Sequence, residues 1–399
     1  MRVAMTCFLF VIVSITLASC GQVEIAQVRA EQTKQKSDEP TRPVTANAKQ
    51  QASWPLFRGD AQSTGVAKSK LPDDLSLLWK FEVKDGAFEG TPVIHDGVAY
   101  IGDLDGEVFA LNLDSGEKKW EYKTEAGFIA SPAIHEGLVY IGDYDGTFYC
   151  LEAESGKPRW KFATDAEIDA CANFYKGNVL IGSQDATLYS VNAKTGELVW
   201  KHTIDDQIRC SPTIIDDRVF LAGCDGKLHI VGLEKGEELA SVDIGAPTGV
   251  TPAVQGDYVY FGTEGGEFLC VNWKQAVMAW SFTGKGGTQP YRSSAAATAE
   301  HVVVGSRAKR VYSLDPTSGD EQWTFASKQR IDSSPVIVGD RVYIGSTDGR
   351  IYGLSLESGD KEWEYEAKGG FTGSPAVAEG KLVIASDEGV VYCFGKIKE

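Results

Sequence analysis

Tryptophan recurs along this chain at intervals of about forty residues, and this period constrains the fold more than any other feature. Successive members of the series are 40 or 41 residues apart, except for one gap of 80 and one of 43. Ala240 lies at the middle of the long gap, where one tryptophan is missing. A period of this length indicates a repeat architecture. The series consists of Trp79, Trp120, Trp160, Trp200, Trp280, Trp323 and Trp363.

Two further markers run in phase with the tryptophans. One is a Ser-Pro or Thr-Pro pair, or a degenerate form of it, beginning at Thr91, Ser131, Cys171, Ser211, Thr251, Ser294, Ser334 and Ser374. The other is a turn, usually Asp-Gly, beginning at Asp105, Asp145, Asp185, Asp225, Gly265, Lys309, Asp348 and Glu388. Because each marker gives eight positions, the chain contains eight repeats.

Each repeat has the pattern of an antiparallel sheet, as residues 334–366 illustrate. Two short apolar runs at 335–338 and 341–345 flank Gly339-Asp340, which is typical of a tight hairpin turn. Further strands are predicted at 350–354 and 361–365, separated by turns that contain glycine. Four strands in about forty residues are the content of one propeller blade. The predicted fold is therefore all-β: an eight-bladed β-propeller of four-stranded antiparallel blades.

The two ends of the repeat region complement each other. The region begins with a tryptophan strand at 77–81 that has no Ser-Pro strand before it. It ends with a Ser-Pro strand, a hairpin and a strand at 390–394, with no tryptophan strand after them. We expect the N-terminal strand to complete the last blade, because this closes the ring and removes the free sheet edges.

Composition divides the chain into three expected parts. Residues 1–19 have the layout of a secretory signal peptide, with Arg2 ahead of a short apolar run at 7–15. Residues 20–50 are rich in polar residues, which predicts a flexible tether, and the propeller takes up residues 51–399. The formal net charge is −17, which argues against nucleic acid and anionic membranes as partners because both are bound through basic patches.

The end of the signal peptide carries a lipidation motif. Leu17-Ala18-Ser19-Cys20 resembles the bacterial lipobox, in which the cysteine is diacylated and becomes the mature N-terminus. The resemblance implies a lipid anchor on Cys20. Gly21 in the next position implies sorting to the outer membrane, with the propeller facing the periplasm.

The corner before each tryptophan carries a second resemblance. Residues 110–120 read ALNLDSGEKKW and residues 190–200 read SVNAKTGELVW. This motif is similar to the tryptophan-docking motif of pyrroloquinoline quinone (PQQ) repeat propellers, in which each indole packs against a glycine of the next repeat. The opening segment at 54–60 also resembles the start of such proteins. Two repeats depart from the motif: residues 230–240 lack the tryptophan, and residues 270–280 lack the glycine.

The same repeats build enzymes and scaffolds, so the resemblance alone leaves the activity open. PQQ-dependent dehydrogenases carry an adjacent cysteine pair, a calcium site and long insertions. This chain has no Cys-Cys pair and near-minimal repeats. We therefore expect no catalytic residues and no PQQ or calcium. A lipid-anchored, eight-bladed PQQ-type propeller resembles the BamB family of outer-membrane assembly scaffolds, which implies a monomeric chain that binds another envelope protein. A PQQ-dependent redox enzyme is the first alternative, and a periplasmic sensor or ligand-binding propeller is the second.

Histidine and cysteine positions add little chemistry. His202, His229 and His301 show no metal-ligand spacing, so no metal site is expected. Cys150, Cys270 and Cys393 occupy equivalent repeat positions and should be free and buried. A 171–210 disulfide is conceivable, with 210–224 as its competitor.

The residues that open each inner strand differ between repeats and form a predicted ring at the mouth of the axial channel. They are Glu89, Ile129, Asp169, Arg209, Gly249, Arg292, Asp332 and Thr372. The preceding residue is apolar in almost every repeat, as packing between blades requires. The mixture of acids and arginines, with an insert at 284–292 on the same rim, predicts a partner-binding face. The alternative is a merely hydrated rim. The residues expected to bind are Asp169, Arg209, Tyr291, Arg292 and Asp332.

Overall fold

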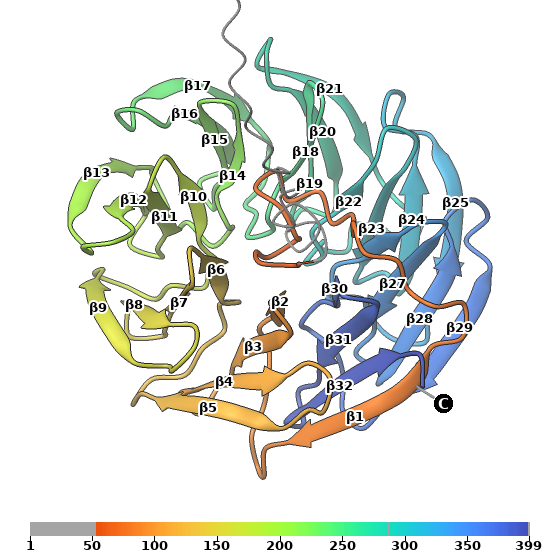
Figure 1. Cartoon of the computed structure of the whole chain (residues 1–399). Helices are drawn as coiled ribbons and strands as arrows, with labels where there is room; N and C mark the ends of the chain where they lie inside the picture. Colours follow the sequence, from red (N-terminus) through yellow and green to blue (C-terminus); the bar gives the residue numbers. More distant parts are fainter. Residues whose placement is uncertain (1–52, 286, 398–399) are drawn as a thin grey trace, which may run out of the picture. The chain divides into compact units, whose positions relative to one another are not determined.

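The computed structural model describes residues 53–285 and 287–397. The expected signal peptide, the expected lipidation site at Cys20 and the expected tether lie outside these residues. Within them every regular element is a β-strand, and the strands form eight four-stranded antiparallel sheets arranged in a ring (Figure 1). The predicted eight-bladed propeller is confirmed.

The first four blades follow the sequence order, with the inner strand first and the outer strand last. Blade 1 contains β2 (Val93–His95), β3 (Val98–Gly102), β4 (Glu107–Asn112) and β5 (Lys118–Lys123). Blade 2 contains β6 (Ala133–His135), β7 (Leu138–Gly142), β8 (Thr147–Glu152) and β9 (Pro158–Ala163). Blade 3 contains β10 (Asn173–Tyr175), β11 (Asn178–Gly182), β12 (Thr187–Asn192) and β13 (Leu198–Thr203). Blade 4 contains β14 (Thr213–Ile215), β15 (Arg218–Ala222), β16 (Lys227–Gly232) and β17 (Glu238–Asp243).

The remaining blades have the same plan, and only the last takes its outer strand from the other end of the chain. Blade 5 contains β18 (Ala253–Gln255), β19 (Tyr258–Gly262), β20 (Phe268–Asn272) and β21 (Val277–Phe282). Blade 6 contains β22 (Ala296–Ala297), β23 (Val302–Ser306), β24 (Arg310–Leu314) and β25 (Glu321–Ala326). Blade 7 contains β26 (Val336–Val338), β27 (Arg341–Gly345), β28 (Arg350–Ser355) and β29 (Lys361–Glu366). Blade 8 contains β30 (Ala376–Ala378), β31 (Lys381–Ala385), β32 (Val390–Gly395) and β1 (Ser76–Glu82).

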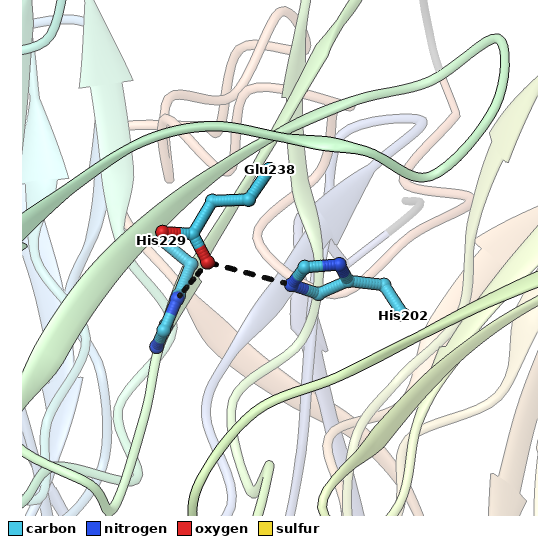
Figure 2. Close-up of side chains that lie close together, drawn as sticks. All are labelled: His202, His229 and Glu238. Carbon is cyan, nitrogen blue, oxygen red and sulfur yellow. Dashed lines mark hydrogen bonds and ion pairs between the residues drawn. The ribbon is translucent and has the colours of Figure 1, made fainter.

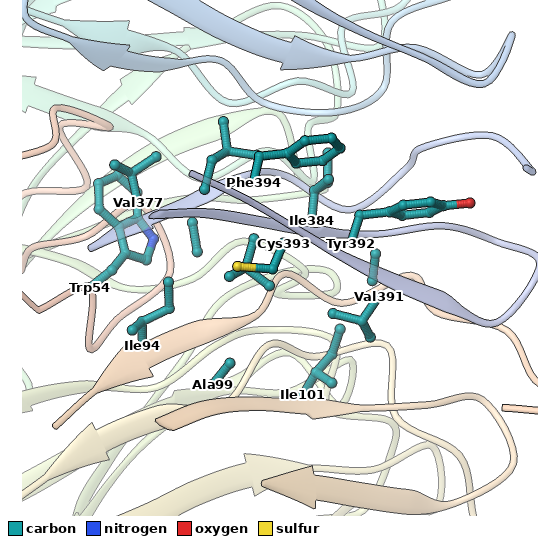
Figure 3. Close-up of a cluster of buried hydrophobic side chains, with 14 of the residues drawn as sticks. Trp54, Ile94, Ala99, Ile101, Val377, Ile384, Val391, Tyr392, Cys393 and Phe394 are labelled. Carbon is teal, nitrogen blue, oxygen red and sulfur yellow. The ribbon is translucent and has the colours of Figure 1, made fainter. Parts of the chain in front are cut away.

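Strand β1 closes the ring as predicted. It pairs antiparallel with β32, from Ser76 opposite Gly395 to Glu82 opposite Val390. The adjoining core joins blades 8 and 1, and it contains the fully buried Phe394 together with Ile94 (Figure 3). The first strand of the ring is therefore held by the last through both backbone pairing and apolar burial.

The tryptophans lie between neighbouring blades. In seven interfaces the indole Nε1–H donates to a backbone carbonyl of the following blade, at 2.7–3.1 Å. Most of these rings also cover a corner glycine. A Cβ atom at Gly116, for example, would lie 2.6 Å from the Trp79 ring. Glycine is needed at this corner because of this close approach and because its φ is +75°.

The interface between blades 4 and 5 reverses this arrangement. Blade 4 carries Ala240 in place of the tryptophan, and blade 5 supplies Trp273 from its own corner to the same apolar cluster. Trp273 is 6% exposed, and its Nε1–H donates to the Gly256 carbonyl at 3.0 Å. The corner residue that no longer receives an indole is Ala276, which belongs to the same cluster. The missing tryptophan of blade 4 and the missing corner glycine of blade 5 therefore belong to the same interface, where Trp273 supplies the indole that residue 240 lacks.

A closed ring of hydrogen bonds explains the Ser-Pro marker. The backbone N–H of each first marker residue donates to the side chain of the equivalent residue in the next blade, and Ser374 returns to Thr91. Seven of these bonds end on a hydroxyl oxygen at 2.8–3.0 Å. The eighth ends on the Sγ atom of Cys171 at 3.2 Å. These bonds satisfy buried backbone donors at the point where the inner strands converge.

Candidate functional site

The axial channel opens in a small cavity of about 240 Å³. All eight residues of the predicted strand-entry ring line it, from Glu89 in blade 1 to Thr372 in blade 8. The hydroxyl ring lies directly behind them, because Thr91 and Ser131 also line the cavity. Equivalent positions of the eight repeats therefore line the same cavity, with one strand-entry residue from each blade.

The segment before β1 crosses the inner end of this channel. Its backbone bonds to inner strands on opposite sides of the ring, for example Trp54 with Ile94 of β2 in blade 1 and Gln62 with Val254 of β18 in blade 5. Ser69 reaches the hairpin of blade 8, where its Oγ accepts from the Gly380 N–H. The segment contacts all eight blades, and it closes the inner end of the channel around Phe57, which lines the cavity.

Arg58 fixes this segment in place. The side chain is buried, and its Nη2 donates to the Ala295 carbonyl at 3.0 Å and to the Pro335 carbonyl. Burial lowers the pKa of Arg58 to about 9, while the charge of Asp60 acts in the opposite direction. The guanidinium therefore bridges blades 6 and 7 from inside the channel.

The charged residues of the mouth are organised in pairs. Arg209 Nε lies 3.4 Å from Asp169 Oδ2. Arg292 Nε lies 2.7 Å from Glu264 Oε1. Arg307 Nε and Nη2 donate hydrogen bonds to Asp332 Oδ1 and Oδ2, at 2.8 Å and 2.9 Å. The two arginine side chains of the predicted ring are 38% and 39% exposed, so they remain accessible to a partner despite these pairs.

Glu89 differs from the other acids of the mouth. Its pKa is raised, first by partial burial and then by the negative charges of Asp169, Asp387 and Asp332. A carboxyl group in this position takes up a proton more readily than an exposed glutamate does. The negative charges of three other blades therefore act together on Glu89.

The expectation that Tyr291 faces a partner is wrong. Its side chain is 2% exposed, and its ring lies 5.7 Å from that of Phe268 in the core between blades 5 and 6. A Cβ atom at Gly262 would lie 2.2 Å from Tyr291 Cβ, which shows how closely the residue covers that strand. Tyr291 holds the apolar packing position that precedes each rim residue, so it belongs to the core, and its neighbour Arg292 reaches the mouth.

The six cysteines among the described residues are free thiols. Neither the 171–210 nor the 210–224 disulfide forms. Cys171 instead completes the hydroxyl ring, in which its Sγ accepts from Ser131 N–H. Cys150, Cys270 and Cys393 are fully buried, as predicted, and burial raises the pKa of each to about 12. These thiols are apolar core residues, not nucleophiles.

A second group of polar side chains lies between blades 3 and 4. His202 of β13, His229 of β16 and Glu238 of β17 bring one nitrogen or oxygen atom each to within 4.8 Å of one another (Figure 2). Burial lowers the pKa of His202, which favours the neutral imidazole. The linear spacing of these three residues does not indicate a metal site. An alignment of the repeats reveals the group, because His229 stands where Tyr149, Tyr189 and Tyr352 stand in other blades.

No helix among the described residues is long and apolar enough to cross a membrane.

The architecture and the docked tryptophans define an eight-bladed β-propeller of the quinoprotein-repeat class. A family profile described as "Outer membrane protein assembly factor BamB" matches residues 72–211 and 184–398. The chain therefore belongs to the BamB family of PQQ-repeat propellers. A search of curated proteins finds no match.

Solved structures share the fold at low sequence identity. BamB from Moraxella catarrhalis is 18% identical, with a TM-score of 0.69, and the match covers 81% of this chain and 100% of that chain. The quinohemoprotein alcohol dehydrogenase from Comamonas testosteroni is 14% identical, with a TM-score of 0.74, over 88% of this chain and 82% of that chain. A europium-containing methanol dehydrogenase is 12% identical, with a TM-score of 0.74, over 87% of this chain and 98% of that chain. The fold is thus common to an assembly factor and to dehydrogenases.

Proposed function

We propose that this protein is a non-catalytic, protein-binding scaffold of the cell envelope that acts in outer-membrane protein assembly or a related envelope complex. Membership of the BamB family supports the class of function. The observation that carries the proposal is the channel mouth, where partly exposed arginines and acids from different blades surround a shallow cavity. Such a surface suits a protein partner with exposed polar and charged groups, because charge complementarity provides specificity.

The alternative function, PQQ-dependent oxidation, suits this channel poorly. Pockets for small ligands and cofactors have volumes of about 300–1,000 Å³, whereas this cavity has about 240 Å³. PQQ carries three carboxylates and needs cations around it. The arginines of the mouth already bind Asp169 and Glu264, and partial burial together with the neighbouring acids raises the pKa of Glu89. The residues present therefore do not fit this cofactor, and a redox function is not proposed.

The binding face is tested by reversing the charge of the mouth. We expect the double variant Arg209→Glu, Arg292→Glu to fold normally, because both side chains are partly exposed, but to lose capture of its envelope partner, because the two cations offered to the partner become anions. The measurement is cross-linking and affinity capture from envelope membranes, with mass spectrometry of the captured proteins and a thermal melt of each variant.

A matched control carries the same charge change on the outer strands. Lys123 and Arg159 are 70% and 58% exposed and lie far from the channel, so Lys123→Glu, Arg159→Glu should leave capture unchanged. If the mouth variant melts like the wild type and still captures the same partner, the partner-binding face lies elsewhere.

The lipid anchor is the second part of the proposal and rests on the lipobox resemblance. We expect Cys20 to be the mature N-terminus and to carry lipid, so that the native protein partitions with membranes. Mass spectrometry of the purified N-terminal peptide decides the point. The variant Cys20→Ala should release the protein into the soluble fraction. An unmodified Cys20 in membrane-free native protein would contradict the assignment.

A further inference from the structure

Neighbouring blades pack through a repeated pair of rings. A ring on the outer strand of one blade contacts a ring on the third strand of the next, with centroids 5.1–6.0 Å apart in six interfaces. The six pairs are Phe81–Phe109, Tyr122–Tyr149, Phe162–Tyr189, Phe282–Tyr312, Phe325–Tyr352 and Tyr365–Tyr392. Between blades 3 and 4 the pair is His202–His229, at 6.3 Å. Two imidazoles therefore replace two aromatic rings at one interface.

The hydrogen bonds of the two histidines define which nitrogens carry protons. His202 Nδ1 lies 3.0 Å from the Gly236 carbonyl, which only accepts, so Nδ1 is the donor and Nε2 keeps its lone pair. His229 Nε2 lies 2.8 Å from Asp225 Oδ2, and this carboxylate likewise makes Nε2 the donor. In the neutral rings both remaining lone pairs face Glu238.

Glu238 brings a negative oxygen to the same point. Its Oε2 lies 3.2 Å from His229 Nδ1 and 3.9 Å from His202 Nε2 (Figure 2). Two lone pairs and a carboxylate repel one another unless a proton or a metal ion lies between them, and the contact of His229 Nδ1 with Glu238 Oε2 is short enough for either. Ligands bound tetrahedrally to zinc at about 2.0–2.2 Å are roughly 3.3–3.6 Å apart, close to the two separations from Glu238, and all three ligand atoms lie within 4.8 Å of one another.

We propose that His202, His229 and Glu238 form a binding site for Zn²⁺ or a chemically similar divalent transition metal between blades 3 and 4. Two imidazoles and one carboxylate are ligands that zinc accepts readily, whereas Ca²⁺ and Mg²⁺ prefer oxygen ligands alone.

The surroundings of the three ligands match those of a metal site. Asp225 and the Gly236 carbonyl orient the imidazoles through their second nitrogens, as partners of metal-bound histidines do. The His229 and Asp225 side chains are 4% and 3% exposed, whereas Glu238 is 41% exposed. The ion is thus held on one side by buried groups and is reached by solvent on the other. Because β13 belongs to blade 3 and β16 and β17 to blade 4, the metal cross-links two blades.

The repeat itself supplies the test variant. The double substitution His202→Phe, His229→Tyr reproduces the Phe162–Tyr189 pair of the preceding interface, so it should fold while removing both nitrogen ligands. The full, untagged chain is stripped with a chelator and titrated with Zn²⁺ and, as a spectroscopic probe, with Co²⁺. For the wild type we expect a melting temperature that rises with Zn²⁺ concentration and the visible absorption of tetrahedral Co²⁺. For the double variant we expect neither signal.

Two single variants sharpen the result. Asp225→Asn should weaken Zn²⁺ binding by about 10- to 100-fold while leaving the three ligands in place. His135→Phe removes a histidine in another blade and should leave binding unchanged. The proposal is overturned if Zn²⁺ shifts the wild type and the double variant equally, or if Mg²⁺ has the same effect as Zn²⁺. It is also overturned if the wild type binds no metal and the cluster instead holds a proton, seen as a melting temperature that depends on pH in the wild type alone.

Discussion

A chain that begins at residue 86 is expected to lose its closed ring. Blade 8 then keeps only β30, β31 and β32, and the backbone groups of β32 that pair with β1 become a free edge. The deletion also removes Trp79, which is buried against blade 1, and exposes Phe394 of the adjoining core. Free edges and exposed apolar strands promote aggregation. We expect insoluble protein, or a loss comparable with the whole stability of a domain, about 5–15 kcal/mol.

Two shorter truncations separate closure from the other roles of the N-terminal region. A chain beginning at residue 51 keeps every described contact and should melt like the full chain. A chain beginning at residue 73 loses the segment that crosses the channel but keeps β1, so it should have intermediate stability. Solubility and thermal melts of the three proteins provide the measurement. Equal melting of the chains that begin at residues 51 and 86 would show that β1 does not close the ring.

The substitution Trp273→Ala is expected to lower the free energy of unfolding by about 3–5 kcal/mol, the range for a buried tryptophan. The loss arises because no other indole fills the interface between blades 4 and 5, where blade 4 has only Ala240. Trp273 also contacts Phe220, with ring centroids 5.7 Å apart, and the variant leaves that ring beside a cavity. Urea unfolding followed by circular dichroism measures the change.

A triple variant tests whether Trp273 stabilises this interface by replacing the indole that is missing at residue 240. Trp273→Ala with Ala240→Trp and Ala276→Gly restores the arrangement of the interfaces at Trp120 and Trp160, where the receiving residues are Ala153 and Ala193. Most of the lost stability should return. Ala240→Trp alone should destabilise, because the new indole meets Trp273 and the methyl group of Ala276. Ala276→Gly alone should cost little, because the backbone φ of 52° suits glycine. A triple variant no more stable than Trp273→Ala would contradict this role of Trp273.

The sequence predicted which eight positions surround the channel mouth, but it did not predict the role of every residue assigned to the binding face. The eight strand-entry positions could be grouped from the repeats, because equivalent residues of successive blades lie at the same height along the axis of the ring. Tyr291 was assigned to the binding face because it lies on the insert at the rim and tyrosine is a favoured interface residue, although its repeat position is the apolar one that precedes each rim residue. Its burial follows from the strand register after the insert, which aligns it with Phe128 and Phe371 in the core.

The histidine cluster and the segment across the channel were not predicted. His202 and His229 belong to different blades, so no local spacing relates them to each other. Residues 54–69 contain no strand of their own and pair singly with inner strands throughout the ring. Such contacts depend on the diameter of the assembled channel, which no single repeat specifies.

The sequence by itself determined the number of blades, the order of strands and the closure by β1. It could do so because each repeat encodes the same local hairpins, and unpaired edges at the two ends leave one way to complete the ring. Only the tertiary structure decided what meets across the interfaces: the imidazoles against Glu238, Trp273 in place of the residue-240 indole, and Cys171 in the hydroxyl ring. These contacts are set by the stacking of one blade on the next, which brings together side chains that have no fixed separation along the chain.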